Sequence, residues 1–203
     1  MNSDRLKALT DGVVAVIITI MVLEMKPPEA TTLPALLAIA PVFLSYVLSF
    51  VYVAIYWNNH HHFFALTPKV TGAIMWANFN LLFWCSLIPF STAWMGEHEL
   101  QAWPTAVYGL VLLACALAWY VMQAAIIHAQ GAQSDLKQAL GSDWKGKLSP
   151  FLYASGIGLS FVSPACAAVV YAAVAMLWLV PDRRFARHVA NRAPTDHHDT
   201  TAA

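Results

Sequence analysis

Few ionisable side chains in this sequence lie where they could do chemistry, and Asp11 is the first of them. It lies near the start of the apolar stretch 5–25, RLKALTDGVVAVIITIMVLEM, in which Gly12–Leu23 carries no charge. A carboxylate in this position is explained either by solvation at a membrane interface or by a polar contact inside a helix bundle. In the second case we expect it to contact polar groups on the next two helices, with these candidates: Asn78, Asn80 and the histidines His60, His61 and His62.

The three consecutive histidines and the three cysteines are the other candidates for chemistry. Adjacent residues on a helix point about 100° apart, so His60–His62 cannot all face one metal ion, and we expect hydrogen bonding instead. The cysteines Cys85, Cys115 and Cys166 lie in apolar runs without CxxC spacing, so the sequence predicts neither a metal site nor a disulfide framework. No nucleophile is paired with a base and no two carboxylates are paired within a span, so we expect no enzyme and no cofactor.

The composition indicates which elements must position these residues. The chain has 203 residues, of which 59% are hydrophobic and 11% are charged, whereas soluble domains have about 25% charged residues. We therefore expect an all-α integral membrane protein. The formal net charge is +0, which gives no electrostatic argument for nucleic acid binding. The first apolar stretch lacks a cleavage site, so we interpret it as a retained span.

Six transmembrane helices are predicted from the apolar runs in a domain covering residues 1–192. The run 148–180 is too long for one ordinary span, and Ser163-Pro164 divides it, because a residue before proline is pushed away from helical dihedrals. Pro41 should bend the second helix, and the polar segment 58–69 is interpreted as a turn. The predicted spans are about 5–25, 33–57, 70–95, 100–127, 148–162 and 164–180, followed by a polar, disordered tail at 193–203.

The distribution of basic residues predicts the orientation. If the chain has six spans and both termini in the cytoplasm, Lys26 is the single basic residue on the outer side of the membrane. This is a strong positive-inside bias, because cytoplasmic loops carry an excess of Lys and Arg. The basic residues on the inside are then Arg5, Lys7, Lys69, Lys137, Lys145, Lys147, Arg183, Arg184, Arg187 and Arg192.

One face of the first helix groups four residues at helical spacing. Thr19, Ile20 and Leu23 follow Val16 at +3, +4 and +7, so the four share a face. Packing or lipid contact would explain such an apolar stripe. Asp11 falls about 140° away from Val16, and Lys7, four residues before it, is positioned to pair with it locally.

Arg5, Leu9, Thr10 and Asp11 form the pattern Arg-x-x-x-Leu-Thr-Asp at the start of the first helix. In this pattern the sequence resembles the lysosomal potassium channel family (transmembrane protein 175) and its bacterial members. That family carries Arg-x-x-x-Phe-Ser-Asp, so Leu9 and Thr10 depart from its Phe and Ser. The similarity continues through GVVAVIITIMVLEM, through Trp57, Asn58 and the histidine run, and through NLLFWCSLIPFSTAW and AMLWLVPDRR.

The resemblance implies a homotetramer in the bacterial inner membrane, with four first helices lining a central potassium pore. Val16 would form a hydrophobic constriction and Thr19 a hydroxyl layer, with Ile20 and Leu23 extending the lining. The motif residues Arg5, Leu9, Thr10 and Asp11 would serve assembly. Because the sequence has no TVGYG-like loop, potassium would be favoured over sodium only weakly. The alternative from another class is a proton- or ion-coupled secondary transporter, which would use broken helices around a midplane site.

Overall fold

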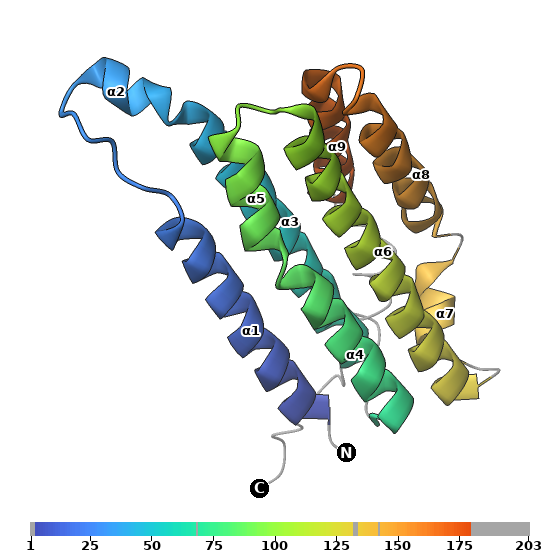
Figure 1. Ribbon diagram of the computed structural model, residues 1–203. Coiled ribbons are helices and arrows are strands. Elements are labelled where there is room, and N and C mark those ends of the chain that lie inside the picture. The colour runs from blue at the N-terminus through green and yellow to red at the C-terminus, as the bar shows by residue number, and fades with distance from the viewer. Residues whose placement is uncertain (1–2, 68, 132–133, 142, 180–203) are drawn as a thin grey trace, which may run out of the picture.

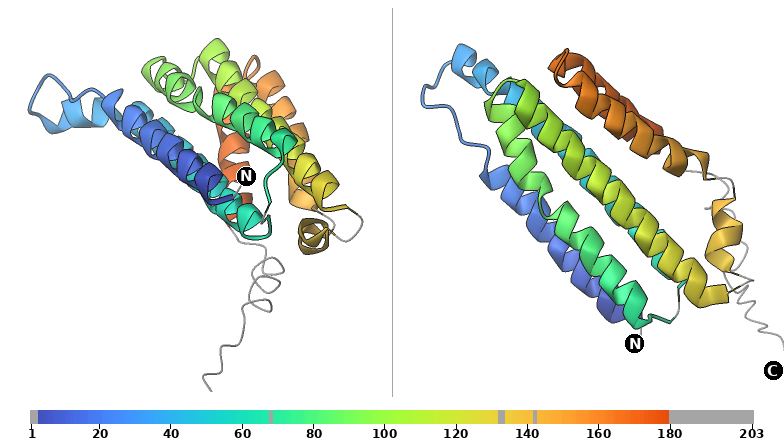
Figure 2. Two further views of the ribbon diagram at one scale, coloured as in Figure 1. Left: turned by 90° about the horizontal axis from the view of Figure 1, so that it is seen from below. Right: turned by 45° about the vertical axis from the view of Figure 1, so that its right-hand side comes forward.

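The computed structural model describes residues 3–67, 69–131, 134–141 and 143–179, and every regular element in these ranges is a helix. The all-α fold predicted from the composition is therefore confirmed for these residues. Figures 1 and 2 show long helices side by side, with α1 at one edge of the molecule and α8 and α9 at the other. The helices are α1 Ser3–Leu23, α2 Leu33–Ala38, α3 Ala40–Ala65, α4 Gly72–Cys85, α5 Ile88–Glu97, α6 Ala102–Gln130, α7 Asp135–Leu140, α8 Trp144–Leu159 and α9 Pro164–Leu179.

Among the described residues, four helical stretches are long and apolar enough to cross a bilayer. They are α1, α3, the stretch Gly72–Glu97 that contains α4 and α5, and α6. The helices α8 and α9 have 16 residues each, fewer than the roughly 20 that an ordinary span takes. The prediction that the chain crosses the membrane six times therefore stays a prediction. The predicted tail 193–203 and the four basic residues that follow α9 lie outside the described residues.

Helix α3 is longer than the sequence predicted. The interpretation of residues 58–69 as a polar turn was wrong, because α3 continues through Ala65. The polar residues of this stretch do not end the helix, since His60, Phe63 and Phe64 are buried against the rest of the bundle. At the other end, the helix is interrupted at Ile39. Pro41 lies in the first turn of α3, where a proline is tolerated.

A second interruption separates α4 from α5. The break falls at Ser86 and Leu87, and Pro89 again lies in the first turn of the helix that follows. The Ser86 hydroxyl donates to the Phe83 carbonyl at 2.7 Å and satisfies a group at the end of α4. Helix α5 packs chiefly on α3 and also on α6 and α1, while α4 packs chiefly on α6 and also on α1. The predicted third span is thus two helical pieces whose main neighbours differ.

In the part of the chain that the structure describes, the core is divided between two sets of buried apolar residues. One set lies among α1, α3, α4 and α6 and includes Ile17, Ile74 and Met122. The other lies among α3, α6, α8 and α9 and includes Tyr108 and Tyr171. We call the end of the bundle where α1 begins and α6 ends the N-terminal end (Figure 1).

Candidate functional site: the uncovered face of α1

Helix α1 is covered on one face and uncovered on the other. Its buried residues recur at three- to four-residue spacing, as expected for one face of a helix against α3, α4 and α5. The opposite face carries Val16, Ile20 and Leu23, which are 55%, 40% and 79% exposed. Thr19 lies on this face and is exposed as well. The buried residues are Ser3, Leu6, Thr10, Ile17 and Met21.

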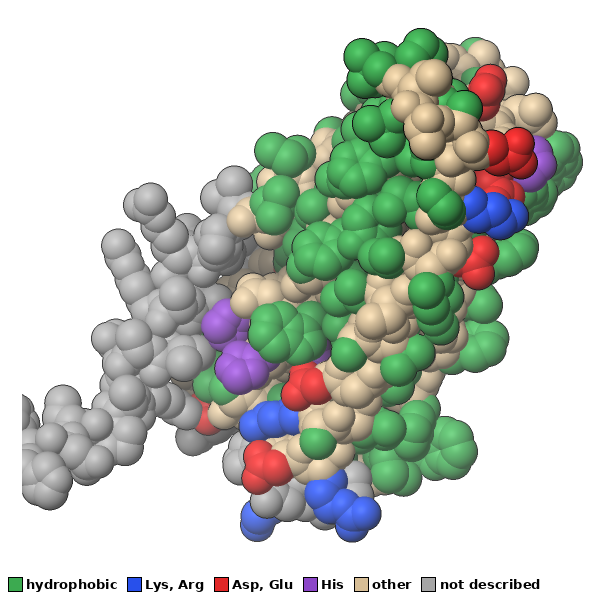
Figure 3. Space-filling view, turned by 90° about the vertical axis from the view of Figure 1, so that its left-hand side faces the viewer, with side chains coloured by type: hydrophobic (Ala, Val, Ile, Leu, Met, Phe, Trp, Pro, Cys, Tyr) green, Lys and Arg blue, Asp and Glu red, His purple; other side chains and the backbone are tan. Residues whose placement is uncertain are grey.

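The surface on the α1 side of the molecule is apolar between two charged ends. Figure 3 shows hydrophobic side chains and uncharged surface in the middle, with acidic, basic and histidine side chains gathered toward both ends. At the end where α1 finishes, Lys26 Nζ lies 3.9 Å from Glu97 Oε1 and links the following loop to α5. This distribution is what a membrane-embedded segment requires, because charges are costly in hydrocarbon.

Thr19 offers the one hydroxyl among the four predicted lining residues. Its Oγ1 donates to the Val16 carbonyl at 2.9 Å, so its proton is used within the helix. The oxygen keeps its lone pairs, because a hydroxyl has one donor and two acceptor positions. The group that points away from α1 is therefore an acceptor, which is the chemistry that a partly dehydrated cation needs.

Thr10 belongs to a buried polar network that joins α1 to α3 and α4. Asn78 Nδ2 donates to Thr10 Oγ1 at 3.1 Å, and His60 Nε2 lies 2.8 Å from Asn78 Oδ1. Because an amide oxygen only accepts, Nε2 carries the proton in this contact. Thr10, His60 and Asn78 are 2%, 3% and 0% exposed, so each depends on the others for its hydrogen bonds.

Asp11 has a different partner from the ones expected. The Trp57 indole Nε1 donates to Asp11 Oδ1 at 2.8 Å. The expected polar partners were wrong, because Asn78 and His60 bond to each other and Asn78 bonds to Thr10. The expected pairing with Lys7 was also wrong, since Lys7 Nζ lies 3.5 Å from Asp4 instead. Asp11 remains exposed, so this contact lies at the edge of the bundle.

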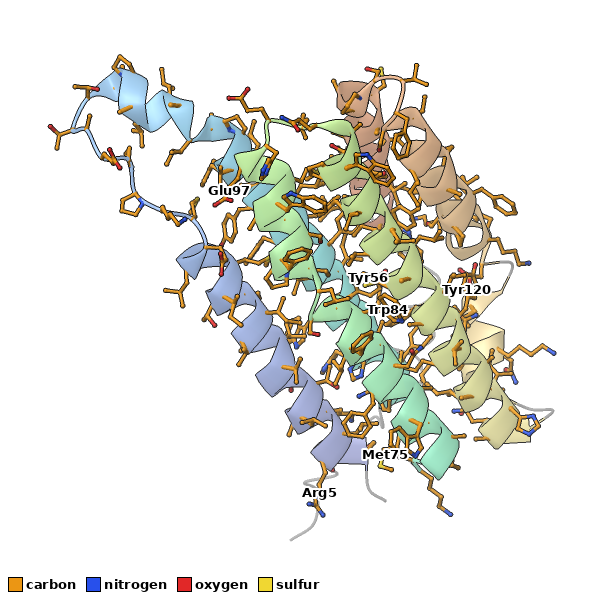
Figure 4. All side chains as sticks on the ribbon, in the orientation of Figure 1. Arg5, Tyr56, Met75, Trp84, Glu97 and Tyr120 are labelled. Carbon is orange, nitrogen blue, oxygen red and sulfur yellow. The ribbon has the colours of Figure 1, made fainter. Side chains whose placement is uncertain are left out.

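The four motif residues divide between the two faces of α1. Thr10 and Asp11 bond to neighbouring helices, whereas Arg5 and Leu9 are exposed. Leu9 lies seven residues before Val16 and Arg5 eleven before it, so both share its face at about 100° per residue. Figure 4 shows Arg5 projecting at the start of α1, at the N-terminal end of the bundle. Among the described residues, the hydrogen bonds that join the motif to other helices come from Thr10 and Asp11.

The consecutive histidines of α3 lie beside one another and beside an aromatic ring. His61 and His62 lie with their ring centroids 5.7 Å apart, and His61 lies 6.3 Å from the Trp57 ring. Within the described ranges, no group of three or more His, Cys, Asp or Glu residues is arranged to hold a metal ion. The cysteines Cys85 and Cys115 are free and buried, and Cys166 is free and exposed.

A second buried hydroxyl network could not be recognised from the sequence. Ser49 Oγ lies 2.6 Å from Thr92 Oγ1 and 2.9 Å from Tyr108 Oη, joining α3, α5 and α6. Hydroxyl residues in apolar helices often bond their own backbone, as Thr92 also does to the Ile88 carbonyl. Composition alone therefore does not distinguish hydroxyl residues that bond to another helix from hydroxyl residues that bond only to the backbone of their own helix.

Comparison with known proteins assigns the family. The sequence model of the family described as the endosomal/lysosomal potassium channel TMEM175 matches residues 5–89, from α1 into α5. A potassium channel of Chryseobacterium sp. (strain P1-3) is 47% identical over 184 residues, which are 91% of this chain and 96% of that protein. The chain belongs to the TMEM175 family. Because this is an ion-channel family, the prediction that the chain is not an enzyme is confirmed.

Other members of the TMEM175 family agree in sequence and in structure. A potassium channel of Streptomyces collinus is 32% identical over 175 residues, covering 80% of this chain and 84% of that one. The crystal structure of a lysosomal potassium-selective channel TMEM175 homolog from Chamaesiphon minutus superposes with a TM-score of 0.78 at 27% identity. The superposition covers 90% of this chain and 97% of that chain, so the two folds agree over nearly their whole lengths.

Proposed function

We propose that this protein is a potassium-selective cation channel that conducts passively through a pore lined by α1. The observation that carries the proposal is the uncovered face of α1, where Val16, Ile20 and Leu23 are exposed beside the Thr19 hydroxyl. In a monomer, this membrane-embedded face would meet lipid. In a homotetramer of six-helix subunits, four copies would face one another across an axis. The names of the relatives as potassium channels support a pore over lipid contact.

Val16 and Thr19 would form two layers with different roles. They are three residues apart, which is about 4.5 Å along the helix axis. A ring of four Val16 side chains would close the pore by dewetting, and a small displacement would open it. A ring of four Thr19 oxygens would replace part of the hydration shell of a cation. Ile20 and Leu23 would extend the apolar lining toward the far end of α1.

The polar contacts of α1 support this assignment, because they fix which face is uncovered. Thr10 bonds into the network of Asn78 and His60, and Asp11 accepts from Trp57. Both contacts lie on the first three turns and hold α1 against rotation about its own axis. Residues of the motif would therefore serve assembly by orienting the pore-lining face. Arg5 and Leu9, which lie on the uncovered side, would act between subunits.

The permeant ion is potassium, with a preference over sodium weaker than that of a filter with several rings of carbonyls. A single layer of hydroxyls replaces fewer hydration waters than such a filter does. No cofactor is part of this mechanism. We place the protein in the bacterial inner membrane with both termini in the cytoplasm. The described basic residues Arg5, Lys7, Lys69, Lys137, Lys145 and Lys147 would then lie on the cytoplasmic side.

Recording from purified protein in planar bilayers tests the proposal. We expect steady unitary currents at fixed voltage, and a reversal potential in potassium/sodium gradients that favours potassium. Native mass spectrometry of the same preparation should show four chains. A transporter turns over too slowly to give unitary currents, so their absence from tetrameric protein at all voltages would contradict the channel assignment. A monomer that conducts would contradict the shared pore.

A further inference from the structure

A cavity lies on the side of the molecule away from the proposed pore. Its volume is about 350 Å³, and its lining comes from α3, α6, α7, α8 and α9. Small-molecule sites in proteins usually measure about 300–1,000 Å³. No residue of α1, which the structure describes from Ser3 to Leu23, lines it. The cavity is therefore separate from the uncovered face of α1 and needs its own explanation.

The cavity walls are mainly aromatic and aliphatic. Tyr52 and Tyr56 of α3, Trp119 of α6, Tyr153 of α8 and Trp178 of α9 supply large rings. Small and aliphatic side chains complete the walls, namely Ala54, Ile55, Ala116, Ala139, Leu140 and Leu179. Walls of this kind favour an apolar ligand, because burying apolar surface is the main source of binding energy at such sites.

Polar groups gather toward one end of the cavity. Asn58, Asn59 and His62 lie near the end of α3, and Gln123 lies in the second half of α6. Both of these helix ends belong to the N-terminal end of the bundle. Deeper residues such as Tyr52 lie nearer the middle of α3. A ligand matched to this lining has an apolar body and one polar end, which is the form of a membrane amphiphile.

Two groups at the polar end, the Tyr120 hydroxyl and the Asn59 amide, can form hydrogen bonds with a ligand. The Tyr120 hydroxyl is buried and makes no hydrogen bond within the described residues. Figure 4 shows Tyr120 on α6, on the side where α7 and α8 meet. Asn59 is half-buried, and no hydrogen bond of its side-chain amide is found among the described residues. A buried hydroxyl without a partner costs free energy that a hydroxyl-bearing ligand would restore.

The two charges at the cavity already have protein partners. Asp143 accepts from the Gly146 backbone N–H at 3.2 Å and from Gln123 Nε2 at 3.4 Å, as the cap of α8. Lys145 Nζ donates to the Leu177 carbonyl at 3.1 Å. Because both charges are engaged and of opposite sign, the cavity does not favour an ionic head group over an uncharged one.

We propose that this cavity binds one uncharged, single-chain amphiphile with a hydroxyl-bearing head, of the monoacylglycerol class. The chain contacts the aromatic walls, and the head bonds to Tyr120 and Asn59. The polar end lies toward the N-terminal end of the bundle, so the head group lies near the level of Asp11, whose carboxylate bonds to Trp57 two residues before Asn59. The cavity volume suits one acyl chain rather than two. This proposal does not depend on whether α1 conducts ions.

Photolabelling of the full-length protein in phosphatidylcholine liposomes tests the site. The probe is a monoacylglycerol with a diazirine in its acyl chain, and the competitor is unlabelled monoolein. We expect labelling in the stretches 52–63, 116–123 and 143–153, and we expect excess monoolein to remove most of it. Labelling that is spread over exposed residues and resists the competitor would overturn the proposal, because it would report general lipid contact.

Two matched variants on α6 make the test specific. Ala116→Phe fills the cavity, whereas Ala124→Phe makes the same change on an exposed position of the same helix. We expect the competed labelling to disappear in the first and persist in the second, with both proteins eluting as wild type does. Competed labelling that is equal in both correctly eluting variants would overturn the assignment.

A third variant keeps the test decisive if Ala116→Phe does not fold. Tyr120→Phe removes one hydroxyl and leaves the cavity volume nearly unchanged. We expect monoolein to compete about fivefold less well, as the loss of one net hydrogen bond implies. Competition by the hydrocarbon 1-octadecene, which has no head group, should not change. If Tyr120→Phe left monoolein competition unaltered, the proposed head-group contact would be wrong.

Discussion

Thr10 and Thr19 lie nine residues apart on α1 and therefore on opposite faces, since nine steps of about 100° make two and a half turns. Thr10 is 2% exposed, and its hydroxyl oxygen accepts from Asn78 on another helix. Thr19 is exposed, and its hydroxyl donates to its own helix. Threonine thus links two helices at Thr10, whereas at Thr19 its oxygen remains available to accept a bond from outside the helix.

This difference separates structural from functional requirements in a helix that is apolar nearly all round. Ile17 and Met21 on the covered face are of the same type as Ile20 and Val16 on the uncovered one. Hydrophobicity therefore does not distinguish the two faces. Lipid tails are as apolar as these side chains, so an apolar face gains little free energy by packing on protein rather than on lipid. The polar residues on α1 set its rotation, so substitutions at Thr10 and Thr19 should have effects of different kinds.

The largest effect is expected from Thr10→Val, compared with Thr19→Val. Valine keeps the shape of threonine, but at Thr10 it leaves the buried Asn78 amide without an acceptor. We expect Thr10→Val to lower the free energy of unfolding by about 1–3 kcal/mol, while Thr19→Val changes it little. Thermal unfolding in detergent, followed by size-exclusion chromatography, measures both. Equal losses in the two variants would contradict the distinction between the faces.

The next largest effect concerns the uncovered face alone. Val16→Asn should hydrate the proposed constriction and raise the basal current. If the barrier falls by about 1.4 kcal/mol, the current rises about tenfold. The control is Val22→Asn, which makes the same change at another exposed position of α1 about 120° away from Val16. Equal currents in the two variants would remove Val16 from the constriction.

Much of the fold could be predicted from the sequence, because apolar runs between polar flanks define helices in a membrane protein. The break near Pro164 followed from the length of the run and from proline geometry. The extension of α3 through His60 to Ala65 could not be predicted, since a run of histidines is polar by composition. Whether such residues form a loop or a buried helix end depends on neighbours such as Asn78, which is 18 residues away in sequence.

The uncovered face of α1 was also predictable, because Val16, Thr19, Ile20 and Leu23 recur with the period of a helix. The partner of Asp11 was not. Trp57 and Asn78 lie on two helices that both pack against α1, and choosing between them requires the rotation of all three helices. A helical wheel gives the direction of a side chain on its own helix and does not give what another helix presents to it.

A smaller effect is expected on selectivity. Thr19→Val removes the hydroxyl oxygen from the proposed second layer, whereas Thr19→Ser keeps it. We expect the potassium/sodium permeability ratio to fall toward one in Thr19→Val and to stay near wild type in Thr19→Ser. Reversal potentials in bi-ionic solutions measure this ratio independently of current size. An unchanged ratio in an assembled Thr19→Val tetramer would exclude a role for this hydroxyl in selection.

The smallest effect is expected at Asp11, where the covered face meets the edge of the bundle. Its hydrogen bond from Trp57 is short, but Asp11 is exposed and Trp57 is 44% exposed. Water can therefore replace each partner, and we expect the pair to contribute only about 0.5–1.5 kcal/mol. A double-mutant cycle of Asp11→Leu and Trp57→Phe in thermal unfolding measures that coupling. Asp11→Asn, which keeps an acceptor oxygen, should lose less stability than Asp11→Leu. Because the Asp11 carboxylate bonds to Trp57 of α3 and lies eight residues, about 12 Å along the axis, from Thr19, neither variant should alter the permeability ratio of assembled channels, and an altered ratio would place this carboxylate in the ion pathway.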